Sequence, residues 1–538
     1  MIRFQAVLGI VSLAIGMQAD GMQQERRSLS DSTYAVRYVV GYLAKNWWSK
    51  PVYTCEKAIV IPQDLPAPEA LAQSMAEKIG VHNFMRGAST SAHQCGKLCT
   101  PEKCSWSRFA QRYDLPQPSD DANKMDWDRY YRSYIDYAKD ELKLNALRFS
   151  VEWALVQPNP GEWDIATLDR YADMFCYAIK RGITPVVCFH HYTDPNWFLE
   201  QGGFYDAHTS RHFVDFCVAT YEHILHVVGK APAVVAASKS INAPLWATYN
   251  TPAGYAFRGY HQYAGPPADS DCSGLDVVAQ VLKNMLEAHV QVYQRMKVLH
   301  AQANTAMPTP KVGLLKNIHQ IDPAKATWGQ YAASPITRML VSFADMIQNG
   351  AIYRFFTTGE YQVHIPCKVH IKHTNSQAPH SLDFIGLNYY ANRHMHLTTG
   401  IKPTDPDVIS DNEWYYRYPQ GIYRAIVELS ENIAHPLQIP LFVAENGIAT
   451  TDDAKRARFY HEYLYAMNKA VQDGYPVTGY LPWTLADNYE WPTIENHKPR
   501  SFGLCAVVAD NPAQLCVKEG TRATYGAFVK EMNRLEQK

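Results

Sequence analysis

The stretch Thr184-Pro-Val-Val-Cys-Phe189 carries apolar residues at consecutive positions. The stretch Leu382-Asp-Phe-Ile-Gly-Leu387 has nearly the same character. Strands that helices cover on both faces have continuous apolar runs of this kind, whereas strands with one exposed face alternate apolar and polar residues. Both stretches therefore predict buried strands of a parallel sheet.

Further short runs that favour strands occur along the chain, and longer stretches with the apolar spacing of helices separate them. The eight predicted strands are Phe84–Ala92, Ala146–Val151, Thr184–His190, Val234–Asn242, Lys311–Lys316, Leu382–Asn388, Pro440–Glu445 and Pro476–Trp483. Strands that alternate with helices indicate βαβ units. Eight such units predict an α/β fold, a single (β/α)8 TIM barrel with long βα loops. A doubly wound open sheet is the alternative, but no glycine-rich phosphate loop follows any of the strands.

The chain begins with features of an export signal. One positive charge at Arg3 precedes the apolar stretch Phe4–Ile15, and small residues follow it. We therefore predict a signal peptide at residues 1–19, with a buried amphipathic helix as the alternative. Residues 20–80 are interpreted as an N-terminal extension, and residues 81–538 as the barrel. The expected location is secreted, periplasmic or otherwise extracytoplasmic, and no run is long enough for an integral membrane segment.

Charge and cysteine content exclude several classes of protein. The 538 residues include 51 Lys and Arg against 52 Asp and Glu, so the electrostatic argument for a nucleic-acid partner is missing. The 11 cysteines are thinly spread, which does not fit a disulfide-framework domain. Cys95, Cys99 and Cys104 match no zinc pattern, so we expect a local disulfide and neither a metal nor a cofactor.

Polar and aromatic residues lie in the predicted strands or directly after them. They include Gln94, Arg148, His191, Asn242, Asn388, Tyr390, Glu445, Trp483, Glu490 and Trp491. In a barrel of this type the chemistry is found at the carboxyl ends of the strands. Amides and carboxylates hydrogen-bond hydroxyl groups, and tryptophan faces stack on sugar rings. The set therefore predicts a carbohydrate site, although any one member is more often structural.

Several motifs in chain order resemble those of glycoside hydrolase family 1, the retaining β-glycosidases, over roughly residues 80 to 535. They are Leu147-Arg-Phe-Ser-Val-Glu-Trp153, Phe189-His-His-Tyr-Thr-Asp-Pro195, Asp383-Phe-Ile-Gly-Leu-Asn-Tyr-Tyr390, Val443-Ala-Glu-Asn-Gly-Ile448 and Trp483-Thr-Leu-Ala-Asp-Asn-Tyr-Glu-Trp491. The resemblance implies hydrolysis of β-linked O-glycosides, of the β-glucosidase or β-galactosidase type, with retention of configuration. The implied partner is a β-linked glycoside or oligosaccharide.

The resemblance also implies roles for individual residues. Glu445 matches the nucleophile, and Arg148 and Tyr390 match the groups that hold its carboxylate ionised and in position. The implied substrate-binding residues are Gln94, His191, Asn242, Asn388, Trp483, Glu490 and Trp491, with Asn242 on the sugar 2-hydroxyl. Glu490 matches a residue typical of members that use unphosphorylated sugars, so a 6-phospho-glycosidase is not expected.

One position departs from the family pattern. The family has Asn-Glu-Pro at the end of the fourth strand, and the sequence Asn242-Ala243-Pro244 aligns with it, which puts Ala243 at the acid/base position. Retaining hydrolysis needs two carboxyl groups about 5–5.5 Å apart, one to attack and one to protonate the leaving oxygen. Alanine cannot supply a proton, so we expect reduced activity or activity limited to activated leaving groups.

Three interpretations of this loss remain open. In the first, the protein hydrolyses glycosides whose leaving group departs without protonation, a case that plant thioglucosidases resemble. In the second, another ionisable group replaces the missing acid, and the nearest in sequence are Lys239, Asp194 and His190. Alternatively, the chain is a catalytically inactive pseudo-glycosidase that binds carbohydrate or protein, as the Klotho-type receptors of this family do.

Overall fold

The computed structural model describes residues 59–538 apart from 121–123, 263, 268–271, 304, 319, 324–333, 366–368, 397–399, 404–416, 476 and 492–499. Eight parallel strands form a closed barrel in the order β1-β13-β12-β9-β5-β4-β3-β2. Their bounds are β1 Met85–Ser89, β2 Ala146–Ser150, β3 Thr184–His190, β4 Leu245–Asn250, β5 Lys311–Asn317, β9 Phe384–Asn388, β12 Leu441–Glu445 and β13 Val477–Tyr480. The predicted (β/α)8 barrel is therefore confirmed.

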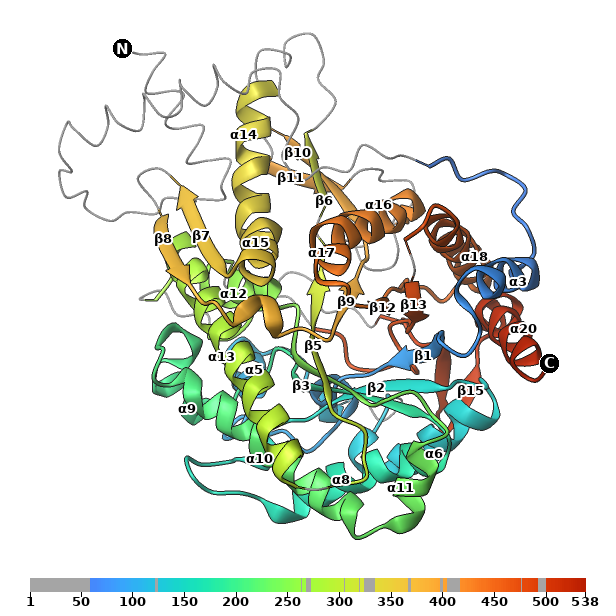
Figure 1. Cartoon of the computed structure of the whole chain (residues 1–538), viewed down its shortest axis with the longest axis horizontal. Coiled ribbons are helices and arrows are strands. Elements are labelled where there is room, and N and C mark those ends of the chain that lie inside the picture. Colours follow the sequence, from blue (N-terminus) through green and yellow to red (C-terminus); the bar gives the residue numbers. More distant parts are fainter. Residues whose placement is uncertain are drawn as a thin grey trace, which may run out of the picture.

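Helices surround the barrel (Figure 1). The longer ones are α6 Trp127–Asp140, α8 Ile165–Lys180, α10 Ser210–Gly229, α13 Leu275–Gln302, α14 Ser334–Asp345, α16 Pro419–Leu429, α18 Asp453–Gln472 and α20 Ala527–Glu536. Because successive strand residues point to opposite faces, each strand packs one set of side chains against these helices. The other set fills the barrel interior, where residues such as Val186, Phe384 and Phe442 form a separate apolar cluster.

The predicted fourth strand is wrong. Most of the run Val234–Asn242 belongs to α11, which spans Pro232–Ser238, and the strand follows at Leu245–Asn250. A proline in the first turn and an alanine-rich sequence favour the helix. Asn242 and Ala243 consequently precede β4 and lie at the amino end of the barrel, opposite the end where the chemistry is expected.

Smaller sheets lie outside the barrel, two of them in segments between barrel strands and one after β13. They are β6 Gln320–Pro323 with β10 Asn392–His396 and β11 Gly400–Pro403, the hairpin β7 Glu360–Ile365 with β8 Val369–Thr374, and the pair β14 Cys505–Val508 with β15 Asn511–Val517. The long loops expected from the chain length are thus partly structured.

The described part of the predicted extension begins with helix α3, Pro68–Ile79, which packs against α18 and α20 (Figure 1). Its residues Leu71, Ala72 and Met75 are buried in the main core. The side-chain amide of Gln73 donates to Glu531 Oε1 at 2.7 Å. The predicted signal peptide, residues 1–19, lies outside the described residues. Among the described helices, none combines the length and apolar character needed to span a bilayer.

Candidate active site

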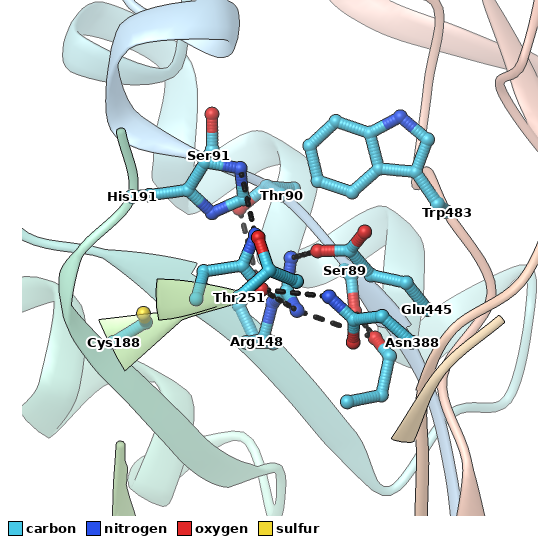
Figure 2. Close-up of polar contacts among 12 residues, drawn as sticks. Ser89, Thr90, Ser91, Arg148, Cys188, His191, Thr251, Asn388, Glu445 and Trp483 are labelled. Carbon is cyan, nitrogen blue, oxygen red and sulfur yellow. Dashed lines mark hydrogen bonds and ion pairs between the residues drawn. The ribbon is translucent and has the colours of Figure 1, made fainter. Parts of the chain in front are cut away.

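Glu445 lies at the carboxyl end of β12, and two donors hold its carboxylate. Figure 2 shows one of them, Arg148, beside Glu445. Arg148 from β2 donates from Nη2 to Oε1 at 2.5 Å, and the Tyr390 hydroxyl donates to Oε2 at 2.8 Å. Arg148 is completely buried and Glu445 is 6% exposed. Charge-assisted bonds of this kind compensate a buried carboxylate and fix its orientation. The three residues predicted from separate motifs therefore meet in one site.

An amide network extends from Arg148 across the barrel. Asn250 Oδ1 accepts hydrogen bonds from Asn388 Nδ2 at 2.8 Å and from Arg148 Nη1 at 3.4 Å. The amide nitrogen of Asn250 must then face His191, whose Nε2 lies 3.3 Å away. His191 Nε2 is therefore the acceptor, and its Nδ1 carries the proton. Burial, and then the nearby charge of Arg148, lower the pKa of His191 well below its usual range, which keeps the ring neutral.

Several buried polar atoms at this end of the barrel have no hydrogen-bond partner within the described part of the chain. They include Nδ1 of His191, Oδ1 of Asn388 and Oδ1 of Asn317 at the end of β5. Buried polar groups are nearly always satisfied in folded proteins. A donor and two acceptors left open together match a ligand that carries several hydroxyl groups.

Trp483, Glu490 and Gln94 form a second group of contacts. Trp483 Nε1 donates to Glu490 Oε1 at 2.7 Å, and Gln94 Nε2 donates to Glu490 Oε2 at 3.4 Å. The His191 ring stacks on Trp483 with centroids 5.6 Å apart. Burial raises the pKa of Glu490 to about 7, while the Trp483 hydrogen bond opposes that rise. The group combines an aromatic face with acceptors for hydroxyl protons.

Trp491, another predicted substrate residue, lies in an aromatic cluster. Its ring stacks on His93 with centroids 5.4 Å apart and touches Trp106 at 4.3 Å between centroids. It also lies 6.1 Å from the ring of Tyr192. Trp491 is partly buried.

The residues expected at the end of the fourth strand were assigned to the wrong Asn-x-Pro triplet. The structure ends β4 with Asn250, followed by Thr251 and Pro252, and this triplet matches the family's Asn-Glu-Pro pattern. Asn250, not Asn242, contacts Arg148, so Thr251, not Ala243, occupies the second position. The aromatic and β-branched run Trp246-Ala-Thr-Tyr249 before the triplet is the signal that could have identified it.

Thr251 is buried, and its Oγ1 lies 2.5 Å from the Tyr192 hydroxyl. Neither group is a carboxyl, so the departure from the family pattern persists at the corrected position. A Cβ on Gly254 would lie 2.5 Å from the Tyr192 hydroxyl. Glycine at position 254 therefore provides the space in which the Tyr192 side chain reaches Thr251.

The three residues considered as replacements for the missing acid are committed elsewhere or distant. Asp194 is fully buried, with Oδ1 3.0 Å from His190 Nε2 and Oδ2 accepting from Tyr255 at 2.9 Å. Two of the three candidate acids, His190 and Asp194, therefore contact each other. Lys239 directly follows α11 and precedes β4, at the amino end of the barrel. Among the described residues, the Glu445 carboxylate bonds to Arg148 and Tyr390, and to none of these three residues.

Comparisons with known proteins agree with this architecture. A family model described as Glycosyl hydrolase family 1 matches residues 80–530. A wheat (Triticum aestivum) 4-hydroxy-7-methoxy-3-oxo-3,4-dihydro-2H-1,4-benzoxazin-2-yl glucoside beta-D-glucosidase is 25% identical over 459 residues, covering 76% of this chain and 77% of the relative. A 6-phospho-beta-galactosidase of Lacticaseibacillus casei is 24% identical over 489 residues, which cover 80% of this chain and 94% of the relative.

The solved structure of a beta-glycosidase from Pyrococcus horikoshii superposes with a TM-score of 0.67 and 26% sequence identity. The superposition covers 84% of this chain and 94% of the other. The family model spans most of the chain, and the closed barrel with its buried Glu445 site agrees with the match. The chain belongs to glycosyl hydrolase family 1.

Proposed function

We propose that the protein is a β-glycosidase with an intact nucleophile, Glu445, and without an acid/base carboxyl, because Thr251 stands in its place. The observation that carries the proposal is the buried Glu445 carboxylate held by Arg148 and Tyr390 at the carboxyl end of the barrel. The open polar atoms of His191 and Asn388 beside it support a sugar as the ligand.

In the proposed reaction Glu445 attacks the anomeric carbon and forms a covalent glycosyl ester, and the aglycone leaves with the electron pair of the glycosidic bond. An alcohol such as Thr251 cannot protonate the departing oxygen at neutral pH. The aglycone must therefore be stable as an anion, and water must hydrolyse the ester without a positioned base. The missing group costs about 10²–10⁴-fold in rate, or roughly 3–5 kcal/mol of barrier.

The proposed substrates are β-glycosides of unphosphorylated sugars. Glu490 shares its carboxylate between Trp483 and Gln94. A sugar phosphate brought against this acidic group would be repelled when Glu490 is ionised. We therefore keep this substrate class, although one of the relatives is named as a 6-phospho-beta-galactosidase.

A second candidate function is carbohydrate binding without turnover, or presentation of the same site to a protein partner. The contact that favours it is the 2.5 Å separation between the Tyr192 hydroxyl and Thr251 Oγ1. The two hydroxyls satisfy each other at the position where the family has its acid/base carboxyl. Such a site retains the sugar-facing amides while the catalytic position is closed.

Single-turnover kinetics distinguish the two functions. We expect an aryl β-glucoside with a dinitrophenol leaving group to give a burst of about one equivalent per chain and a glycosyl adduct on Glu445 by mass spectrometry. Azide should accelerate the steady state, because it attacks the ester without a base. Absence of a burst together with sugar binding by calorimetry would establish the binding function.

Two variants make this test specific. Glu445→Gln should abolish the burst and the adduct. Glu519→Gln is the matched control, because Glu519 is an exposed carboxylate at the start of α19, Glu519–Thr521. A burst that survives in Glu445→Gln would refute the assignment of the nucleophile.

We also propose that the chain is exported, on the basis of its predicted signal peptide at residues 1–19. N-terminal sequencing of the protein purified from its native source tests this proposal. A mature chain that begins at or just after residue 20 is the expected result, and a chain that retains Met1 would contradict it.

A further inference from the structure

Three metal-ligating side chains meet beside the sugar site. Nδ1 of His93 and the sulfurs of Cys99 and Cys104 all lie within 4.8 Å of one another. His93 belongs to α4, Ala92–Cys95, and Cys104 is the N-cap of α5, Ser105–Arg112. His93 and Cys104 are buried, and Cys99 is partly buried. The cluster thus joins two neighbouring elements through soft ligands shielded from water.

The separations fit a tetrahedral metal site. Zinc binds cysteine sulfur at about 2.3 Å and histidine nitrogen at about 2.0–2.1 Å, which puts sulfur and nitrogen ligands about 3.5 Å apart. Cys104 Sγ lies 3.5 Å from His93 Nδ1. Cys104 also lies close enough to Cys99 for a thiol–thiol hydrogen bond. The donors are therefore already at the spacing that one ion would impose.

Glu152 is a buried carboxyl that does not belong to the three-residue cluster. It is the residue before α7, Trp153–Val156, and it is 1% exposed. Its Oε2 accepts from Thr193 at 2.9 Å, while Oε1 has no hydrogen-bond partner among the described residues. Burial, and then the charge of Cys104, raise the pKa of Glu152 well above its usual range. Burial thus favours the neutral form of this carboxyl, and the cluster itself consists of His93, Cys99 and Cys104.

We propose that His93, Cys99 and Cys104 bind one Zn²⁺ ion, with a solvent molecule as its fourth ligand. One imidazole nitrogen and two thiolate sulfurs are ligands that suit this ion. Binding releases the protons of the two thiols, and the positive ion then balances the charge of the thiolates. The cysteine spacing Cys95-x3-Cys99-x4-Cys104 does not reveal this site in the sequence, because only two of the three cysteines belong to it. Cys95 instead accepts a hydrogen bond from Asn488.

The ion would position two of the predicted substrate-binding residues, Trp491 and Gln94. The His93 ring is parallel to Trp491, with an interplanar angle of 7°, and the next residue is Gln94, which contacts Glu490. Nε2 of His93 is buried without a partner in the described structure, so no second hydrogen bond fixes the ring. A metal bond at Nδ1 would fix the orientation of the His93 ring, and this ring is the surface on which Trp491 stacks.

Metal analysis of the full-length protein tests the proposal. We expect about one equivalent of zinc per chain after purification without chelators. Cys104→Ser and Cys99→Ser should each retain at least about tenfold less zinc. Cys176→Ser and Cys516→Ser are matched controls, because they remove a buried and an exposed thiol elsewhere, and should retain zinc as the wild type does.

Cobalt provides an independent readout. The protein stripped with a chelator and loaded with Co²⁺ should show thiolate-to-cobalt charge-transfer absorption that saturates at one equivalent. If the serine variants do not fold, this titration of the wild-type chain decides the question. Failure to bind zinc or cobalt, equal zinc in all variants, or a Cys99–Cys104 disulfide in non-reducing peptide maps of the intact protein would overturn the proposal.

Discussion

Restoring a carboxyl at position 251 is the sharpest test of the corrected site. A glutamate there extends beyond Thr251 Oγ1, and the Tyr192 hydroxyl already lies 2.5 Å from that atom. Tyr192 cannot simply retreat, because it occupies the space beside Gly254. We therefore predict a small gain from Thr251→Glu alone and the full gain from Thr251→Glu combined with Tyr192→Phe.

The size of the gain depends on the leaving group. A positioned general acid and base contributes about 10²–10⁴-fold, or roughly 3–5 kcal/mol of barrier, where the aglycone needs protonation. For an alkyl β-glucoside, kcat/KM of the double variant should exceed that of the wild type by this factor. A dinitrophenyl β-glucoside should gain little in its first step, because its leaving group departs as an anion.

The assay is kcat/KM across a series of β-glucosides whose aglycones span a range of acidities. The wild type should show a steep dependence on aglycone acidity, and the double variant a shallow one. Ala243→Glu is the matched control, since it adds the same residue at the amino end of the barrel and should gain nothing. A gain in Ala243→Glu, or none in the double variant while the Glu445 adduct still forms, would refute the placement.

Three further predictions concern the buried charges and the first helix. Arg148→Met leaves Glu445 as an unpaired buried charge, so the free energy of unfolding should fall by about 3–5 kcal/mol, and adding Glu445→Gln should recover part of the loss in urea denaturation. The pKa of Glu490 is raised from 4.5 to about 7, so the folded state binds more protons than the unfolded state between these values. Wild-type stability should therefore decrease as pH rises from about 4.5 to 7 and level off above, whereas Glu490→Gln should lack this component; equal pH dependence in the two proteins would contradict the shift. Met75→Ala should lower the free energy of unfolding by about 2–5 kcal/mol, because the side chain of Met75 on α3 is completely buried in the main core. A loss within error of zero would mean that α3 is not part of the folded unit.

Most of the barrel follows from local pattern, and the exception has a physical cause. Six of the eight predicted runs contain their strand, and a seventh, Lys311–Lys316, ends one residue before β5 does, because consecutive apolar residues in short segments are characteristic of buried parallel strands. The pair Val234-Val235 imitates such a run within α11. Local pattern alone could not decide between two Asn-x-Pro triplets eight residues apart, since only the tertiary contact of Asn250 with Arg148 selects one of them.

The site residues that belong to a recognisable sequence motif could be predicted from the sequence. Glu445, Arg148 and Tyr390 come from three motifs and meet as expected. Asn317 was missed because nothing follows its strand that marks it as exceptional. The approach of His93 to Cys99 and Cys104 depends on how α4 packs beside α5, which no spacing in the sequence encodes.

The closure of the barrel has a consequence for biosynthesis. Strand β1 completes its pairing with β13, and Gln73 of α3 bonds Glu531, which is 458 positions later in the chain. Until β13, Val477–Tyr480, has been made, β1 has a neighbour on one side only, and its other edge carries unpaired backbone groups. Contacts between such distant segments form slowly. The nascent protein is therefore an open, edge-exposed sheet for most of its synthesis, and aggregation at this stage competes with ring closure.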